Sequence, residues 1–152
     1  MSSKMRIEKT FKEFIELLNN NNVRYLIIGG FAYSCYAEPR YTKDIDIFIE
    51  SSQTNAENLL NAIRDFGFEE IDLKNKDFLE PDQVIQLGFE PLRIDILTSI
   101  KGVAFKSAWE NRKIYGYGDI KANFISKQDL IKNKRALGRT QDLADLEKLE
   151  KI

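Results

Sequence analysis

Three aspartates in short, regular patterns are the residues of this sequence best suited to chemistry. Asp44 and Asp46 alternate with isoleucines in the segment 44–47, DIDI. Asp95 recurs in the related segment 93–97, RIDIL. Side chains alternate between the two faces of a strand, so Asp44 and Asp46 share one face while the isoleucines point into a core. If the two strands are neighbours, the three carboxylates converge on one patch, where they repel one another unless a cation neutralises them.

Such a cluster suits metal-assisted transfer of a phosphoryl or nucleotidyl group. Divalent ions bridged by carboxylates orient a triphosphate and lower the pKa of an attacking hydroxyl. The sequence contains no histidine, which excludes imidazole acid–base catalysis and zinc sites that use histidine. A metal must therefore be held mainly by oxygen, and we expect Mg²⁺ or Mn²⁺. The simpler alternative is that an isolated Asp-x-Asp on a strand belongs to a solvated face.

A glycine pair ahead of the first two aspartates is a candidate phosphate-binding turn. Gly29 and Gly30 follow the apolar segment 23–28 and precede an expected short helix over 31–37. Backbone N–H groups at a strand-to-helix turn are placed where an anionic phosphate can bind. The alternative is a tight left-handed connection that binds no ligand.

Four polar side chains are further candidates for contact with a nucleotide. Arg40 and Thr42, just before the first aspartate, either contact phosphate or line the mouth of the strand. Lys134 lies within the apolar stripe of an expected helix, so its side chain either snorkels to solvent or reaches a buried anion. Arg139 follows the glycine that ends this helix and would add a second cation near a phosphate cleft.

Expected helices and strands alternate along the chain and position these residues. This alternation favours one α/β domain that spans residues 1–152. We expect its C-terminal helices, at about 126–150, to pack on the core. Two aspartates, Asp142 and Asp145, stand at the start of the last helix, where the helix dipole favours acidic groups. The expected helices cover 6–18, 31–37, 54–66, 102–112, 126–137 and a last segment from residue 140. The expected strands cover 23–28, 44–49, 68–73, 84–89, 92–97, 114–118 and 120–125, with a loop over 74–82.

Composition limits the functional classes. A chain of 152 residues with a net charge of -1 has the size of one domain and no global basic field of the kind that favours nucleic-acid binding. Its one cysteine, Cys35, cannot form an internal disulfide and suits a reducing cytosol. No apolar run approaches the roughly 18 residues of a membrane span, and the lysine-bearing start lacks the apolar core of a signal peptide. We therefore expect a cytoplasmic protein with no membrane contact.

Taken together, these motifs resemble the minimal nucleotidyltransferases of the DNA polymerase β-like superfamily. The resemblance rests on the glycine pair at 29–30, on Arg-x-Thr-x-Asp-Ile-Asp-Ile at 40–47 and on Arg-Ile-Asp-Ile-Leu at 93–97. The segment 134–145, with Lys-x4-Arg-x2-Asp-x2-Asp, is similar to the tail of the abortive-infection toxin branch. The similarity extends over roughly 20–149, nearly the whole chain.

The resemblance implies a mixed sheet flanked by helices, with the site at one end of the sheet. It also implies that Asp44 and Asp46 hold Mg²⁺ and the triphosphate, while Asp95 completes a second metal site and helps to deprotonate the acceptor hydroxyl. The implied phosphate contacts are backbone and cationic groups, namely Gly29, Gly30, Lys134 and Arg139.

The predicted function is the transfer of a nucleoside monophosphate from an NTP to a hydroxyl acceptor, with release of pyrophosphate. The sequence leaves the acceptor open among RNA such as tRNA, protein and small molecules. The alternative is a non-catalytic NTP-binding or interaction module, for example one component of a toxin–antitoxin pair. The presence of all three carboxylates favours the enzyme, whereas the small size of the chain favours a partner protein.

Overall fold

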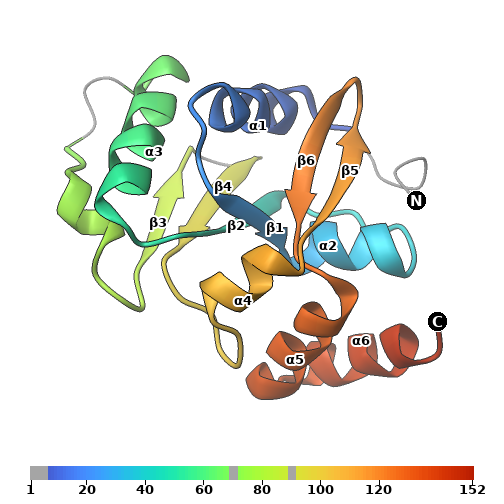
Figure 1. Ribbon diagram of the computed structural model, residues 1–152. Coiled ribbons are helices and arrows are strands. Elements are labelled where there is room, and N and C mark those ends of the chain that lie inside the picture. Colours follow the sequence, from blue (N-terminus) through green and yellow to red (C-terminus); the bar gives the residue numbers. More distant parts are fainter. Residues whose placement is uncertain (1–6, 69–71, 89–91) are drawn as a thin grey trace.

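A six-stranded mixed sheet forms the centre of the computed structural model, which describes residues 7–68, 72–88 and 92–152 (Figure 1). The strand order is β3-β4-β2-β1-β6-β5. Strands β2 and β4 are parallel, as are β1 and β6, and the other neighbouring pairs are antiparallel. The strands are β1 (Tyr25–Ile28), β2 (Asp44–Ile49), β3 (Val84–Leu87), β4 (Arg93–Leu97), β5 (Lys113–Tyr117) and β6 (Ile120–Phe124).

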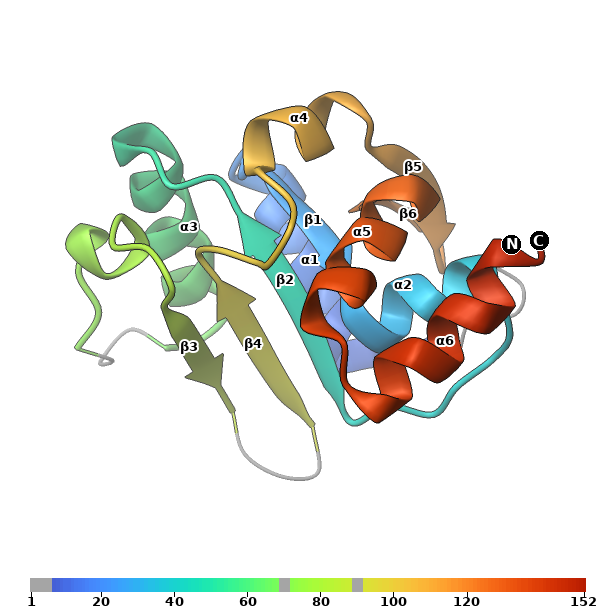
Figure 2. The same ribbon diagram turned by 90° about the horizontal axis from the view of Figure 1, so that it is seen from below.

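Helices cover both faces of the sheet (Figures 1 and 2). Helices α1 and α3 lie on one face, while α4, α5 and α6 lie on the other with α2 beside the last two. In the described ranges no helix is long and apolar enough to span a membrane. The helices are α1 (Lys9–Asn20), α2 (Gly29–Tyr36), α3 (Gln53–Asp65), α4 (Phe105–Glu110), α5 (Lys127–Leu137) and α6 (Thr140–Glu150), with a short 3₁₀ helix at Asn75–Phe78.

The predicted element types are confirmed for most of the chain because the apolar spacing decides them. In α1 the residues at helical spacing are all buried, namely Phe11, Phe14, Ile15 and Leu18. Helix α5 has the two ends that its sequence indicates. The hydroxyl oxygen of Ser126 accepts a hydrogen bond of 3.1 Å from the backbone N–H of Asp129, and Gly138 adopts φ 63° at the other end.

Three local predictions need correction. The helix expected over 102–112 is only Phe105–Glu110, because Gly102 has φ +79° in a turn that precedes it. The segment expected to be a loop over 74–82 contains the 3₁₀ helix, which buries Phe78. The first helix continues to Asn20 rather than ending at residue 18.

Two predictions fall partly on residues 69–71 and 89–91, which lie outside the described ranges. The strand expected over 68–73 has its centre there, and the described residues 68, 72 and 73 are not in a strand. The turn of the hairpin expected around residues 90 and 91 also lies outside these ranges. Its two strands, β3 and β4, pair in antiparallel fashion as expected.

Candidate active site

The register between β2 and β4 brings the three predicted aspartates onto one face of the sheet. In this parallel pair Asp46 lies beside Asp95, and Asp44 lies beside Arg93. Residues in register on neighbouring strands point to the same face. The alternating isoleucines of both strands are buried on the opposite face, namely Ile45, Ile47, Ile94 and Ile96. The expectation that these two strands are neighbours is thus confirmed.

A cavity of about 660 Å³ lies against this face and is lined on another side by residues of α5 and of the α5–α6 corner. Most of the residues predicted from sequence line it, namely Gly29, Asp44, Asp46, Asp95, Lys134 and Arg139. Within the described residues the lining does not include Gly30, Arg40 or Thr42. The structure therefore brings the carboxylates, the start of α2 and two cations together around one space.

Arg93 is a component of this site that the sequence analysis placed on the same strand as Asp95 without assigning it a role. Its Nε donates to Oδ1 of Asp95 at 2.8 Å, and its Nη2 donates to Oδ2 of Asp44 at 2.9 Å. The side chain is 31% exposed. The guanidinium thus bridges two of the three carboxylates and supplies positive charge in their midst.

Asp46 is the carboxylate most affected by its surroundings. Burial raises its pKa to about 6, and the negative charges of Asp95 and Asp44 act in the same direction. Arg93 and Arg139 oppose this shift, which places the Arg139 guanidinium within electrostatic reach of Asp46. A carboxyl group with a pKa this close to neutrality binds a proton or another cation readily.

At neutral pH, Asp46→Asn is expected to increase the free energy of unfolding of the metal-free protein by about 1–2 kcal/mol, roughly half of what the pKa shift implies for a fully buried group. The pKa of Asp46 rises on folding from 3.8 to about 6, so the folded state loses stability as pH increases through that interval. The gain from Asp46→Asn should therefore be largest above the folded-state pKa and vanish below the unfolded-state value.

Urea unfolding on both sides of this interval measures the effect. Asp82→Asn is a matched control, because Asp82 also lines the cavity but is not among the charges that shift the pKa of Asp46. An Asp46→Asn protein that is less stable than the parent at neutral pH would contradict the prediction and would indicate favourable contacts of the Asp46 carboxylate.

The chemistry of the donor set fits a hard divalent cation, since three carboxylates share one face and repel one another. Within the described residues, however, no group of three or more His, Cys, Asp or Glu side chains is arranged to hold a metal ion as it stands. The Arg93 guanidinium holds Asp44 and Asp95 in its own hydrogen bonds. Metal binding would require these carboxylates to reorient.

The glycine pair begins α2 directly instead of forming a separate turn before it. Gly29 adopts φ +65°, and a Cβ atom there would clash with Oδ2 of Asp46. A side chain at this position is therefore excluded both by backbone conformation and by the carboxylate. A Cβ at Gly30 would meet the side chain of Thr42 at 3.6 Å, an ordinary contact. Gly29 is thus the member of the pair that the site requires.

Thr42 shapes the start of β2. Its hydroxyl donates to the backbone carbonyl of Asp44 at 2.8 Å and accepts from the backbone N–H of Asp44 at 3.3 Å. Of the two interpretations left open by the sequence, this geometry corresponds to a residue that lines the mouth of the strand.

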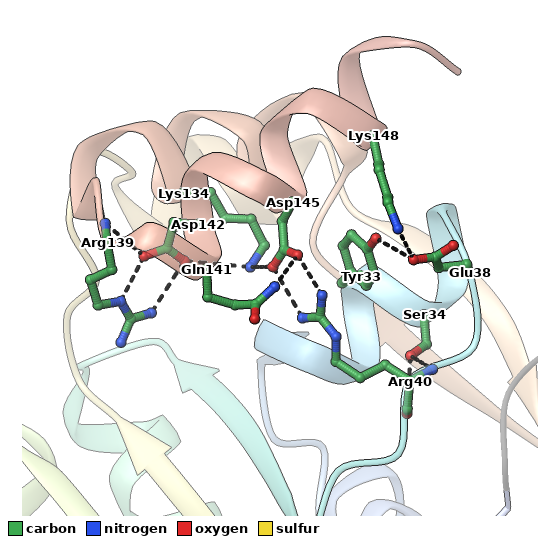
Figure 3. Close-up of polar contacts among 10 residues, drawn as sticks. All are labelled: Tyr33, Ser34, Glu38, Arg40, Lys134, Arg139, Gln141, Asp142, Asp145 and Lys148. Atoms are coloured by element: carbon green, nitrogen blue, oxygen red, sulfur yellow. Dashed lines mark hydrogen bonds and ion pairs between the residues drawn. The ribbon is translucent and has the colours of Figure 1, made fainter.

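Lys134, Arg40 and Arg139 belong to a network of ion pairs centred on two buried aspartates, Asp142 and Asp145 (Figure 3). Lys134 is 5% exposed, and its Nζ lies 2.8 Å from Oδ2 of Asp145. Nη1 of Arg40 lies 3.0 Å from the same oxygen. Nε of Arg139 donates to Oδ2 of Asp142 at 2.6 Å. We refer to these five residues as the tail cluster.

The two aspartates of the tail cluster have a different role from the one that the sequence suggested. Each is 1% exposed, so they are buried counter-ions as well as residues near a helix start. Burial alone would raise the pKa of Asp145, but hydrogen bonds from Arg40, Lys134 and Gln141 hold it at about 2. The buried anion that Lys134 reaches is therefore the protein's own Asp145.

Arg40 links this cluster to the segment that leads into β2. Its guanidinium carbon lies 3.9 Å from the centroid of the Tyr33 ring, and its backbone N–H donates to Oγ of Ser34 at 3.1 Å. A second link joins Lys148 of α6 to Glu38. The C-terminal helices are thus fixed to the chain just ahead of the catalytic candidates.

Lys101 is a cavity residue that the sequence analysis missed. It lines the cavity, and its backbone carbonyl accepts a hydrogen bond of 2.9 Å from Nδ2 of the buried Asn133. A Cβ at the next residue, Gly102, would lie 2.8 Å from Cβ of Ala136, so this turn packs closely on α5. Among the described side chains Lys101 has no acidic partner within ion-pair distance. The position of Lys101 in the cavity follows from the packing of this turn on α5 and could not be predicted from the spacing of residues in the sequence.

Comparison with known proteins identifies a family and two solved structures with a similar fold. A family model described as "Nucleotidyltransferase of unknown function (DUF6036)" matches residues 5–150. The lincomycin-bound lincosamide antibiotic adenylyltransferase LnuA superposes with a TM-score of 0.58 at 20% identity, covering 94% of this chain and 96% of that chain. An antigenic nucleotidyltransferase-like protein from Paracoccidioides brasiliensis gives 0.54 at 16% identity, covering 92% and 74%. No curated protein matches significantly in sequence. The structural likenesses confirm the expected mixed sheet flanked by helices.

Proposed function

This chain belongs to the nucleotidyltransferase family matched over residues 5–150, and on that premise we propose that it transfers a nucleoside monophosphate from an NTP to a hydroxyl acceptor. The observation that carries the proposal is the convergence of Asp44, Asp46 and Asp95 beside the glycine start of α2 in one cavity. The acceptor oxygen would form a bond to the α-phosphorus, and the bond from that phosphorus to the bridging oxygen would break. Pyrophosphate would leave, and the hydroxyl proton would pass to a carboxylate.

Mg²⁺ or Mn²⁺ would be held by Asp44, Asp46 and Asp95. When bound, such an ion neutralises phosphate charge and lowers the pKa of the acceptor hydroxyl. Asp95, which is 8% exposed and held by Arg93, would receive the proton from the acceptor. The backbone N–H groups at the start of α2 would face the outer phosphates.

The cations around the cavity differ in how free they are to bind phosphate. Lys134 is committed to the buried aspartates of the tail cluster, and Arg139 shares its guanidinium with Asp142. Arg139 is still 69% exposed in its side chain, and Figure 3 shows its guanidinium projecting away from α6. Lys101 adds a cation that is fixed through its backbone only. We therefore assign the binding of the phosphates to Lys101 and Arg139. We assign to Lys134 a structural role in holding α5 and α6 together on this side of the cavity.

Lys101→Met is expected to weaken NTP binding about tenfold, as for the loss of one charge-assisted contact. The melting temperature should remain that of the parent, because the replaced group makes no described ion pair. Isothermal titration with a non-hydrolysable NTP analogue measures the affinity.

Lys106→Met is the matched control for this substitution. Lys106 is exposed on α4 and lies outside the cavity lining in the described residues. Equal NTP affinities for the two variants would remove Lys101 from the phosphate site.

The proposed reaction is tested by incubating the protein with each α-labelled NTP, Mg²⁺ and a panel of acceptors. The panel should include tRNA, a cell extract as a source of protein and metabolite acceptors, and a lincosamide, since a structurally similar protein is named as a lincosamide adenylyltransferase. Transfer of label with release of pyrophosphate, lost in Asp95→Asn, would support the proposal. Tight NTP binding without transfer to any acceptor would favour the alternative, a non-catalytic NTP-binding module acting with a partner protein as in toxin–antitoxin pairs.

A further inference from the structure

Arg93 forms a bridge between two carboxylates that line the cavity, Asp44 and Asp95, and the proposed reaction assigns no step to it. Three hydrogen bonds make it, with Nε at 2.8 Å and Nη2 at 3.2 Å from the two oxygens of Asp95, and Nη2 at 2.9 Å from Asp44. Charge-assisted hydrogen bonds of this geometry are among the stronger polar contacts in proteins. The guanidinium therefore engages the same carboxylate oxygens that a divalent cation would need.

We propose that Arg93 is an internal counter-ion that competes with divalent cations for Asp44 and Asp95, so that the metal enters this cavity together with the nucleotide and not ahead of it. The inference rests on the proposed function and deepens it by giving an order of binding. Among the described residues the three carboxylates share a face without forming a ready metal site, and Arg93 holds two of them.

The net charge of the carboxylate cluster supports the entry of the metal together with the nucleotide. Arg93 forms ion pairs with two of the three carboxylates and adds a positive charge to the cluster, so the cluster attracts a free divalent cation less strongly than the carboxylates alone would. Free metal would have to lose water and displace the guanidinium while gaining few new ligands, and Mg²⁺ gives up its water reluctantly. An NTP supplies the missing anionic oxygens, and its phosphates also offer the displaced guanidinium a new partner.

The solvent exposure of the side chains favours the displacement of Arg93 from Asp44. The Arg93 side chain is 31% exposed and that of Asp44 is 34% exposed, so this half of the bridge borders solvent. The Asp95 side chain is 12% exposed. Breaking the contact with Asp44 therefore moves a guanidinium into water, which costs far less than unpairing a buried charge. The more deeply buried contact with Asp95 is the one expected to persist longer.

The test measures Mn²⁺ affinity by electron paramagnetic resonance, with and without a non-hydrolysable NTP analogue. The parent should bind Mn²⁺ weakly alone and at least about tenfold more tightly with the nucleotide present. Arg93→Met should bind nucleotide-free Mn²⁺ at least about tenfold more tightly than the parent, because the carboxylates are released. Arg93→Lys should lie between them, since an ammonium cannot reproduce the fork that spans both carboxylates.

Lys101→Met is the control for a simple loss of positive charge. Lys101 lines the cavity that contains Asp44 and Asp95 but forms no ion pair with a described carboxylate, so its replacement should leave nucleotide-free Mn²⁺ affinity within about threefold of the parent. Circular dichroism and melting curves establish that each variant is folded. Should Arg93→Met fail to fold, Arg93→Lys carries the same comparison.

Unchanged or weaker Mn²⁺ binding in the folded Arg93 variants would overturn the inference, weaker binding indicating that Arg93 prepares the site for metal. Equal gains in Arg93→Met and Lys101→Met would also overturn it, because general charge would then explain both. Failure of the proposed function has a separate signature. In that case no NTP label reaches any acceptor, whereas failure of the inference alone leaves transfer by the parent intact.

Discussion

Asp95→Asn is expected to slow nucleotidyl transfer by about a hundred- to ten-thousandfold, the range typical of removing a positioned general base. Asparagine keeps the size of the side chain and an oxygen that can accept from Nε of Arg93, now 2.8 Å from Asp95. It loses the negative charge that would take the acceptor proton and help to hold the metal. The melting temperature should fall by little, and the rate of pyrophosphate release is the quantity to measure.

A second carboxylate of the same cavity provides the control. Asp82 lines the cavity but does not share the strand register of the three clustered aspartates. It adopts φ 58°, a conformation that asparagine tolerates, so Asp82→Asn should preserve the backbone. We expect its transfer rate to stay within about threefold of the parent, as for a cavity charge outside the reacting cluster. Comparable rates for Asp95→Asn and the parent would exclude Asp95 from the chemistry.

Lys134→Met is expected to destabilise the empty protein by about 3 kcal/mol, the lower end of the range for removing one partner of a buried ion pair. Methionine fills the volume but leaves Asp145, 1% exposed, with less positive charge around it. Nζ of Lys134 lies 2.8 Å from Asp145 and 3.6 Å from Asp142, so both acids lose a partner. Because unfolding of a domain of this size responds by about 2–4 °C per kcal/mol, the melting temperature should fall by about 6–12 °C.

Lys132→Met serves as the matched control on the same helix. The Lys132 side chain is 64% exposed, and its distance to Asp129 is 3.9 Å. Its replacement should change the free energy of unfolding by no more than about 0.5 kcal/mol. The double variant Lys134→Met/Asp145→Asn should recover part of the loss, because the uncompensated charge is removed with its partner. A neutral or stabilising Lys134→Met would mean that the side chain snorkels to solvent after all.

The catalytic candidates could be predicted because they follow from local periodicity. Alternation with buried isoleucines sets the face of Asp44, Asp46 and Asp95, and one assumption about neighbouring strands then brings them together. The positive φ at Gly29 likewise follows from a glycine at a strand-to-helix turn. Element types were predictable for the same reason, whereas the ends of helices depend on packing. The helix at α4 is short because the turn before it packs on α5.

The contacts of the cations were not predictable from spacing. Arg40 and Asp145 are 105 residues apart in the sequence and meet only because α6 packs beside the end of α2. The two aspartates near the start of α6 indicate a favourable interaction with the helix dipole, but their positions in the sequence do not indicate that they are buried. The role of Arg93 was equally hidden, because an arginine two residues before an aspartate on a strand can face solvent or bridge to the next strand. Tertiary packing decides between these outcomes.

The sharing of Asp145 by two cations also restricts how the sequence can diverge. Replacement of Asp145 leaves Arg40 and the buried Lys134 without their common partner, whereas replacement of either cation leaves an excess of negative charge in the same place. Evolution through single neutral steps is therefore difficult at these three positions. Relatives that differ at one of them are expected to carry compensating changes at the others, so covariation should connect the chain ahead of β2 to the last helix even where overall identity is low.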